Sequence, residues 1–522
     1  MLKTCLPTLF LILVVSPARA AAPDVSGTEP TGIQTGQSAD LALQGKPELP
    51  LSVVTDYPGL AVSVSEDGKS LHVDAAQAAA GVAFLRFHNP EGASDLIPLH
   101  IGLLPEVAEV EPNNHWRDAP NVATQTTING VLHAGGEVDT FGCELEQGQT
   151  LVSAVDANTA LASPMDAVLQ ILSPEGFVLE QVDDAYGNDP QLSFIVPTTG
   201  RYFVRLFAFP SAPNSTINFA GGKVYQYRLT LTNGPFIDHL FEGAEGQLNP
   251  HGWNLGEGLD VANTPGRHHY RRLLNLAQPA DVITQSGEAP VPLTLKTRLQ
   301  GNVAPRESVR FQITGTKSTA LRIRVRAQAL YSELDPLVQI LDAEGKLLKE
   351  FDDVGRDNRD VDASWTPPAD ANYTLVLQDR FGHGGERYFF ETLVEEDQPR
   401  ADLTVTANHF EATVDKPLEI EVQIARAGLQ SPLEITATGL PEGAKVTPVT
   451  SEPKGDSSKK VTLKIEHDGN APFSGSIQIL ATIPDAPSEP IVATAPTKLT
   501  GVPTNSIWLT LPAKAKENIE EK

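Results

Sequence analysis

The sequence predicts an all-β protein made of several antiparallel β-sandwiches in tandem. Gly and Pro occur 41 times each among 522 residues, and Met only twice, a composition that favours short strands joined by turns. Many short segments alternate apolar and polar residues, as strands with one buried face do. Residues 165–184 and 334–353 carry closely similar sequences, which is typical of a duplicated module.

The N-terminal segment has the composition of a cleaved signal peptide. Lys3 precedes an apolar run at 9–15, and residues 18–20 (Ala-Arg-Ala) fit the small-residue rule for cleavage. The run is too short to cross a bilayer, and no later apolar stretch reaches the roughly twenty residues of a membrane helix. We therefore expect a secreted protein, extracellular, periplasmic or held at the cell surface, without a membrane span.

The chain is strongly acidic, with a formal net charge of −27. Such a charge repels nucleic acid and anionic lipid, and it favours cations or basic partners. Cys5 lies in the predicted signal peptide, so Cys143 has no partner for an intrachain disulfide. An exported protein of this kind needs an ample core or a bound metal for rigidity.

Residues 21–105 follow the pattern of a small β-sandwich. Apolar and polar residues alternate at 51–54, 61–64 and 70–73, and Asp-Gly at 67–68 marks a turn. Two sheets of such strands would enclose one apolar core. The pattern is that of an immunoglobulin-like sandwich.

The two copies of the repeat are predicted at 106–234 and 291–396. Their strands are spaced as in an antiparallel sandwich. In the first copy we expect strands at 151–155, 167–172, 192–196, 202–207 and 225–231, and in the second at 322–325, 337–341 and 373–377.

The region between the copies, 235–290, is rich in Gly and Pro and is predicted to be a linker or a partial β-domain. It carries a basic run at 267–272. We interpret this run as a solvated loop in an otherwise acidic chain. The alternative is a site for an acidic partner.

Strict alternation returns after the second copy, at 418–424 and 461–465, and predicts a final immunoglobulin-like sandwich. A short charged tail follows it. The predicted order is a signal peptide at 1–20, an immunoglobulin-like sandwich at 21–105, the first repeat copy at 106–234, a linker or partial domain at 235–290, the second copy at 291–396, an immunoglobulin-like sandwich at 397–511 and a tail at 512–522.

Oxygen-bearing side chains gather near the start of the first copy. Carboxylates two residues apart in an extended segment point to the same side, and neighbouring asparagines add amide or main-chain oxygens. If a second acidic segment folds back against the first, the resulting cage suits calcium rather than zinc. The other interpretation is a solvated linker that caps a strand. The candidate ligands are Glu109, Glu111, Asn113, Asn114, Glu137 and Asp139.

Several phrases together resemble the bacterial pre-peptidase C-terminal domain. They are EVEPNN at 109–114, Gly-x-x-Asp-x-Phe at 136–141, Asp-Asp at 183–184 and Gly-x-Tyr at 200–202. The resemblance implies a jelly-roll-like β-sandwich of the kind appended to secreted proteases and similar to the collagen-binding domains of clostridial collagenases. It covers the first copy clearly and the second more loosely.

The resemblance also implies a calcium site. Relatives bind calcium through the N-terminal acidic segment and an aspartate just before the Phe strand. By position these ligands are Glu109, Glu111, Asn113, Asn114 and Asp139, while the place of Glu137 is variable in the family.

The second copy departs from this pattern. Val309 stands where Asp139 stood, and no EPNN phrase precedes it. Valine offers no oxygen ligand, so we expect no metal in the second copy. Paired aspartates at 183–184 and 352–353 recur in both copies, which favours a turn role for them over a ligand role.

No catalytic pattern stands out. The sequence has no HExxH, no G-x-S-x-G and no phosphate-cradling glycine loop. We therefore expect that the protein is not an enzyme but a secreted binding or adhesion protein with a calcium-stabilised module. We expect its partner to be an extracellular protein or a cell-surface polymer, and not a nucleic acid. The alternative is an accessory component of a secreted protease system, for substrate presentation or export, with a protease as partner.

Overall fold

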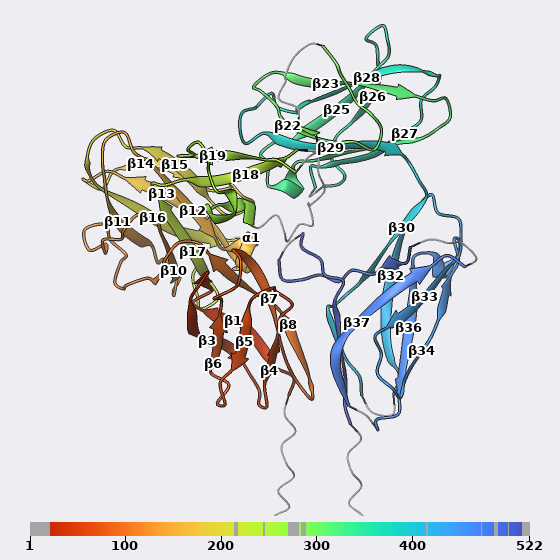
Figure 1. Ribbon diagram of the computed structural model, residues 1–522, viewed down its shortest axis with the longest axis horizontal. Coiled ribbons are helices and arrows are strands. Elements are labelled where there is room, and N and C mark those ends of the chain that lie inside the picture. Colours follow the sequence, from red (N-terminus) through yellow and green to blue (C-terminus); the bar gives the residue numbers. More distant parts are fainter. Residues whose placement is uncertain are drawn as a thin grey trace, which may run out of the picture.

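Nearly every regular element of the protein is a β-strand, which confirms the predicted fold class (Figure 1). The computed structural model describes residues 21–212, 218–243, 246–269, 281–282, 289–356, 358–413, 416–470, 472–484, 489–499 and 501–513. The predicted signal peptide with Cys5, most of the charged tail and residues 270–272 of the basic run lie outside these ranges. Among the described residues, no helix has the length and apolar character needed to span a bilayer.

Two four-stranded sheets form the N-terminal sandwich around one apolar core. In β6, Leu71 and Val73 are buried while His72 between them is exposed, as the alternating sequence requires. One sheet contains β1 (Asp24–Glu29), β3 (Ser38–Lys46), β6 (Ser70–Asp74) and β5 (Ala61–Val64), and the other contains β2 (Gly32–Gln34), β8 (Gly92–Gly102), β7 (Gly81–Asn89) and β4 (Ser52–Val54).

The first repeat copy is a second sandwich, and each of the five predicted strands overlaps an observed one, with ends that differ by at most three residues. Strand β9 pairs in parallel with β10, and Glu109 follows directly after β9. One sheet has the order β15 (Gln191–Ile195), β12 (Thr150–Asp156), β17 (Gln226–Thr232), β10 (Thr126–Val131) and β9 (Glu106–Ala108), and the other has β11 (Asp139–Leu145), β16 (Gly200–Pro210), β13 (Met165–Leu172) and β14 (Val178–Val182).

The second copy repeats this strand order, with β22 to β29 in the places of β10 to β17. Its sheets are β20 (Asp281–Val282), β22 (Arg298–Asn302), β29 (Phe389–Glu396), β24 (Leu321–Arg326) and β27 (Val361–Trp365), and β21 (Val291–Pro292), β23 (Ser308–Gly315), β28 (Ala371–Asp379), β25 (Pro336–Leu341) and β26 (Leu347–Phe351). Strand β20 pairs in parallel with β22 as β9 does with β10. The second sandwich therefore includes residues before 291. The sequence could not show this, because a two-residue strand leaves no periodic pattern.

Each copy also has one short helical turn, α1 (Asn158–Leu161) in the first and η3 (Gln328–Leu330) in the second. A buried aspartate caps each turn. Asp189 accepts the main-chain N–H groups of residues 157–159, and Asp360 accepts those of residues 327–329. The caps are equivalent, so this feature belongs to the shared fold.

The region between the copies contains a β-hairpin of β18 (Phe236–Glu242) and β19 (Leu248–Trp253), followed by a short turn η1 (Val261–Asn263). One end of the hairpin packs on the first copy, where Phe236 meets Val152 and Ala154. The other end packs on the second copy, where Phe241 meets Leu330 and Phe389. The hairpin therefore bridges the two copies (Figure 1).

Arg267, in the basic run, is 2% exposed, and the interpretation of a solvated loop is wrong at this residue. Its guanidinium forms an ion pair with Asp156, donates to Gln191 Oε1 at 2.9 Å and lies over the ring of Tyr186. This burial could not be predicted from the sequence, because the partners of Arg267 lie far away along the chain. A charge buried with such partners fixes the segment on the first copy.

The two copies also contact each other directly. The rings of Tyr186 and Tyr331 stack at 4.1 Å between centroids. Arg387 of the second copy donates to the main-chain carbonyl of Ala185 and, at 2.6 Å, to Asp238 of the hairpin. These contacts hold the first copy, the hairpin and the second copy together.

The C-terminal sandwich contacts the N-terminal sandwich. Arg86 donates to Asn408 Oδ1 at 2.6 Å, and the His88 and Trp508 rings lie 4.9 Å apart. The sheets are β30 (Arg400–Val405), β32 (Leu418–Ala427), β36 (Lys460–His467) and β34 (Ala444–Thr447), and β31 (His409–Glu411), β39 (Ile507–Leu511), β37 (Phe473–Thr482), β33 (Leu433–Thr438) and β35 (Val449–Ser451), with β38 (Ile491–Val492) beside β37.

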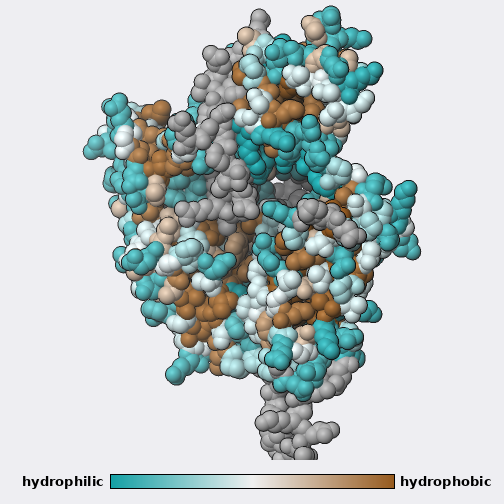
Figure 2. All heavy atoms as spheres, turned by 45° about the vertical axis from the view of Figure 1, so that its right-hand side comes forward, coloured by the Kyte–Doolittle hydropathy of each residue, from teal (hydrophilic) through white to brown (hydrophobic). Residues whose placement is uncertain are grey.

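Hydrophilic residues cover much of the face in Figure 2, and apolar residues reach the surface there in separate patches. This distribution fits a chain with an excess of acidic residues.

Candidate metal centre

The acidic segment crosses from one sheet of the first copy to the other. Glu109 leaves β9 with its N–H bonded to the carbonyl of Asn129, and its Oε1 accepts the N–H of Val131 at 2.7 Å. Further along, the carbonyl of Asn113 accepts the N–H of Thr140 at 3.0 Å. These bonds tie the segment to β10 at one end and to β11 at the other.

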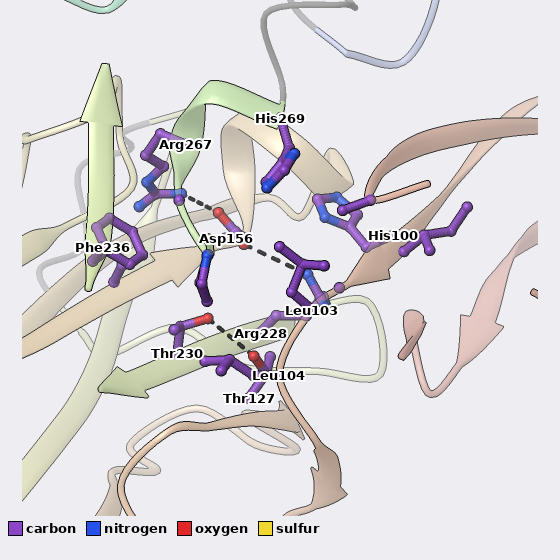
Figure 3. Close-up of a pocket in the computed structure, with 16 residues that line it drawn as sticks. His100, Leu103, Leu104, Thr127, Asp156, Arg228, Thr230, Phe236, Arg267 and His269 are labelled. Carbon is purple, nitrogen blue, oxygen red and sulfur yellow. Dashed lines mark hydrogen bonds and ion pairs between the residues drawn. The ribbon is translucent and has the colours of Figure 1, made fainter. Parts of the chain in front are cut away.

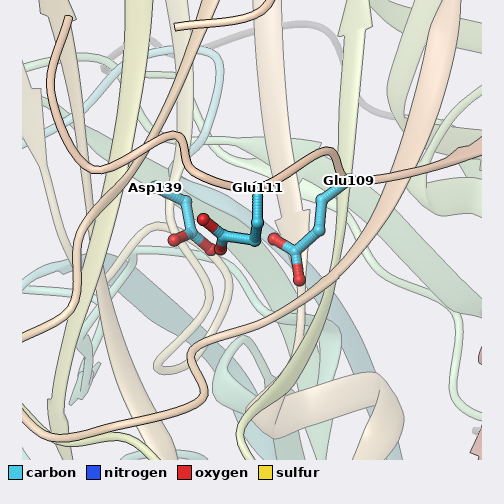
Figure 4. Close-up of side chains that lie close together, drawn as sticks. All are labelled: Glu109, Glu111 and Asp139. Carbon is cyan, nitrogen blue, oxygen red and sulfur yellow. The ribbon is translucent and has the colours of Figure 1, made fainter. Parts of the chain in front are cut away.

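Three predicted ligands come together between these anchors. Glu109, Glu111 and Asp139 each place a carboxylate oxygen within 4.8 Å of the others (Figure 4). Asp139 is fully buried at the start of β11, Glu109 is largely buried, and Glu111 is exposed. The cluster is therefore closed on the side of the core and open to solvent at Glu111.

A tyrosine that the sequence did not single out completes the cluster. The hydroxyl of Tyr227 lies 2.6 Å from Oδ2 of Asp139 and 3.0 Å from Oε2 of Glu109. Tyr227 stands opposite Gly130 in the pairing of β10 with β17. A Cβ at Gly130 would overlap the ring and hydroxyl of Tyr227, so this position requires glycine. Only the strand register could have revealed the role of Tyr227.

Burial makes the cluster unfavourable for bare negative charge. Burial, together with the neighbouring Glu109 carboxylate, raises the pKa of Asp139 to about 9. Burial also raises the pKa of Glu109. The single hydroxyl proton of Tyr227 can serve only one carboxylate at a time. At neutral pH the cluster therefore needs either a proton on Asp139 or a cation.

Buried polar atoms beside the carboxylates lack partners within the described part of the chain. They are Oδ1 of Asp139 and both side-chain amide atoms of Asn113, a residue with no exposed surface. Asn113 is held next to the cluster, because its N–H donates to Oε2 of Glu111 at 3.0 Å. Unsatisfied buried oxygens next to three carboxylates fit a hard cation such as calcium.

Of the other two candidates, Glu137 is not among the three carboxylates of the cluster. Asn114 is exposed. The carboxylate of Glu137 turns back to accept the N–H of Ala134 at 2.9 Å, closing a turn before β11. A carboxylate can satisfy a nearby main-chain donor in this way, and sequence spacing cannot distinguish that bond from a ligand role.

In the second copy, apolar residues replace two groups of the cluster. Val309 stands opposite Leu377 as Asp139 stands opposite Leu206. Phe390 stands opposite Gly301 as Tyr227 stands opposite Gly130. Both Val309 and Phe390 are buried in the core. The carboxylate and the hydroxyl bonded to it are thus replaced together.

A small cavity of about 50 Å³ lies where the N-terminal sandwich meets the first copy (Figure 3). Asp156 at its wall pairs with both Arg228 and Arg267. Burial and the nearby Arg228 lower the pKa of His100 in the wall to about 4, so this imidazole is neutral at pH 7. The volume suits water rather than a larger ligand, and we interpret the cavity as part of a structural junction.

Comparison with known protein families finds a match within the first copy. The family profile described as "Bacterial pre-peptidase C-terminal domain" matches residues 137–208, from before β11 to within β16. Over these residues the first copy is similar to that domain family. The profile begins after the acidic segment, so it covers Asp139 but neither Glu109 nor Glu111.

One curated relative of the chain is described as "Probable subtilase-type serine protease" of Deinococcus radiodurans. It is 28% identical over 118 residues, which are 22% of this chain and 15% of the relative. The chain thus spans only a small part of that protein.

Among solved structures, the pre-peptidase C-terminal domain of a collagenase from Bacillus anthracis matches with 14% identity and a TM-score of 0.18, covering 24% of this chain and all of that one. A structure of the M60 catalytic domain with two CBM51 domains from Clostridium perfringens matches with 9% identity and a TM-score of 0.14, covering 73% of this chain and 55% of the other.

Proposed function

We propose that the chain is a non-catalytic, secreted binding or adhesion protein whose pre-peptidase C-terminal domain holds one calcium ion. The calcium site rests on one observation: three carboxylates from two segments converge beside Tyr227 and the unsatisfied side chain of Asn113. The binding role rests on the family of the domain and on the tandem sandwiches around it.

Glu109, Glu111 and Asp139 would hold the ion, together with Asn113. A bound calcium ion supplies positive charge that offsets the carboxylates, which Tyr227 can satisfy only in part. Oxygen ligands of this kind suit calcium better than zinc, and the three clustered ligands found among the described residues are all carboxylates. The ion would also tie the segment that follows β9 to the start of β11, and thereby stiffen the connection between the first two sandwiches.

The calcium site can be tested by the thermal unfolding of the full chain with calcium and with chelator. A ligand that binds only the folded state raises stability with its concentration. We expect saturating calcium to raise the transition that includes the first copy by about several degrees. Asp139→Val should remove this rise. Glu137→Gln is the matched control, since that carboxylate lies outside the cluster, and it should leave the rise intact. A wild-type transition that does not respond to calcium would exclude the site.

The match to a subtilase-type protease supports a second candidate function. As an accessory component of a secreted protease system, the chain would bind a protease or its protein substrate. Affinity capture from the culture medium of the source organism separates the two. Recovery of a protease with the wild-type chain favours the accessory role, and capture of a surface polymer or matrix protein without any protease favours adhesion.

A further inference from the structure

The outer edge of β14 in the first copy is open and apolar. Strand β14 lies at one end of its sheet and pairs with β13, and no other described strand covers its second edge. Phe177, just before the strand, is 71% exposed, Val178 is 47% exposed and Leu179 is 43% exposed. Exposed strand edges attract further strands, and proteins usually blunt them with lysine, proline or a covering loop.

The second copy contains the blunted form of the same strand. Strand β26 pairs with β25 through the same type of bulge with which β14 pairs with β13. Aligned from the shared glycine, Gly176 in one copy and Gly345 in the other, the sequences that lead into the two strands read Phe-Val-Leu-Glu before and in β14 and Lys-Leu-Leu-Lys before and in β26. Lys346 and Lys349 thus stand where the first copy has Phe177 and Glu180. The edge that is protected in one copy is exposed in the other.

The charges around β14 are negative. Glu175, Glu180, Asp183 and Asp184 lie on or beside the strand, and within the described residues none of them is in a salt bridge. In the second copy the equivalent acidic turn is partly neutralised, because Arg380 pairs with Asp352. The first copy therefore presents an open strand edge with an acidic end.

A cation lies near the N-terminal end of β14, beside Gly176. Gly176 lies against the ring of Trp116, and the guanidinium of Arg117 sits 4.3 Å from the centre of that ring. Three of the four carboxylates, those of Glu180, Asp183 and Asp184, thus lie toward the end away from this cation, while Glu175 lies next to Gly176. This asymmetry sets the direction in which a charged segment would lie.

We propose that β14 is a docking edge for an extended segment of a partner protein, which adds as a strand and carries apolar residues alternating with lysine or arginine. Main-chain hydrogen bonds to the free edge would supply affinity, and the exposed apolar side chains would cover those of the partner. Its basic residues would face Glu180 and the aspartates. A second copy of this chain is a poor occupant, because each copy has a net charge of −27 and residues 177–184 contain no lysine or arginine that could face Glu180.

The full chain can be titrated with a labelled short peptide of alternating valine and lysine, with fluorescence anisotropy as readout. Two further peptides serve as controls: one with glutamate in place of lysine, and one with proline in place of valine, which keeps the charge but lacks half of the N–H donors. We expect saturable binding of the valine-lysine peptide and at least about tenfold weaker binding of both controls.

Variants then locate the site. Phe177→Lys with Glu180→Lys gives β14 the lysines of β26, and it should weaken binding of the valine-lysine peptide by at least about tenfold. Glu180→Lys alone should weaken it in part, and Leu347→Lys on β26 should leave it unchanged. Equal binding of the proline-lysine peptide would overturn the proposal, since charge alone would then explain the affinity. Unchanged binding by the double variant, or a chain dimer that this variant dissociates, would overturn it as well.

Discussion

The hydroxyl of Tyr227 lies 2.6 Å from Oδ2 of Asp139, and the second copy replaces both residues together, with Phe390 and Val309. Removing one partner of a buried hydrogen bond leaves the other unsatisfied, whereas replacing both by apolar groups of similar shape is nearly neutral. The two residues therefore act as one unit. This unit, rather than the strand framework, distinguishes the two copies chemically.

Tyr227→Phe should weaken calcium binding while leaving the fold intact. The hydroxyl bonds to two carboxylates of the cluster, and a hydrogen bond to a charged group contributes about 1.5–3 kcal/mol. We expect an affinity loss of about tenfold or more, measured by calorimetric titration of the full chain.

Tyr202→Phe is the matched control. Its hydroxyl donates to the carbonyl of Thr198 at 2.8 Å and does not touch the cluster. This variant should lose about 1 kcal/mol of stability and keep the wild-type calcium affinity. Equal effects of the two tyrosine variants on calcium binding would mean that the hydroxyl of Tyr227 has no specific role.

Calcium binding should release a proton. Since the pKa of Asp139 is raised to about 9, its carboxyl is protonated at pH 7 without metal and ionised with it. The affinity should then rise with pH by up to about tenfold per unit below pH 9. Titrations at pH 7 in buffers of different ionisation enthalpy should report about one proton released per ion, and Asp139→Asn should abolish this release.

The same shift sets the pH dependence of the metal-free protein. The folded-state pKa of Asp139 lies above its unfolded value of 3.8, so the folded state binds more protons between about pH 4 and pH 9. In chelator, the free energy of unfolding should decrease as the pH rises through this window. Denaturant unfolding should show this decline for the wild type, and a smaller one for Asp139→Asn. A wild-type stability that rises with pH across the same range would contradict the assignment.

The sequence could predict those parts of the site that lie in short, continuous segments. Glu109 and Glu111 are two residues apart in an extended segment and point to the same side, and Asp139 stands at a strand start, so the convergence of these three carboxylates could be predicted. Tyr227 is 88 residues from Asp139, and its role depends on the register of β10 with β17. Glu137 lies outside the carboxylate cluster, and its carboxylate accepts a main-chain N–H three residues away.

Contacts between domains could not be predicted from the sequence either, because they join residues that lie far apart along the chain. The strands of both copies follow from local alternation, since each buries one face. Arg267, in contrast, is buried by Asp156 and Gln191, which lie 111 and 76 residues away. A basic run looks the same in the sequence whether it is solvated or docked.

Arg387→Met should loosen the two copies from each other. The guanidinium reaches Asp238, Glu333 and the main chain of Ala185, and its loss leaves the buried carboxylate of Asp238 without its arginine. Breaking a buried pair in this way costs about 3–5 kcal/mol. Small-angle scattering should show a larger radius of gyration, and the junction should unfold at lower denaturant concentration.

Arg380→Met is the control for this variant, because its pair with Asp352 is exposed. An exposed pair contributes about 0–1 kcal/mol, so scattering and unfolding should remain close to wild type. If Arg387→Met behaves as this control does, the contacts of Arg387 do not hold the copies together.

The most direct test of the calcium site is the stoichiometry of binding, measured by equilibrium dialysis of the full chain against radioactive calcium. We predict one saturable site per chain in the wild type. Asp139→Val with Tyr227→Phe, which gives the first copy the pair found in the second, should remove this site while the chain stays folded. Absence of saturable binding to the wild type, or one full site retained by the double variant, would contradict the account.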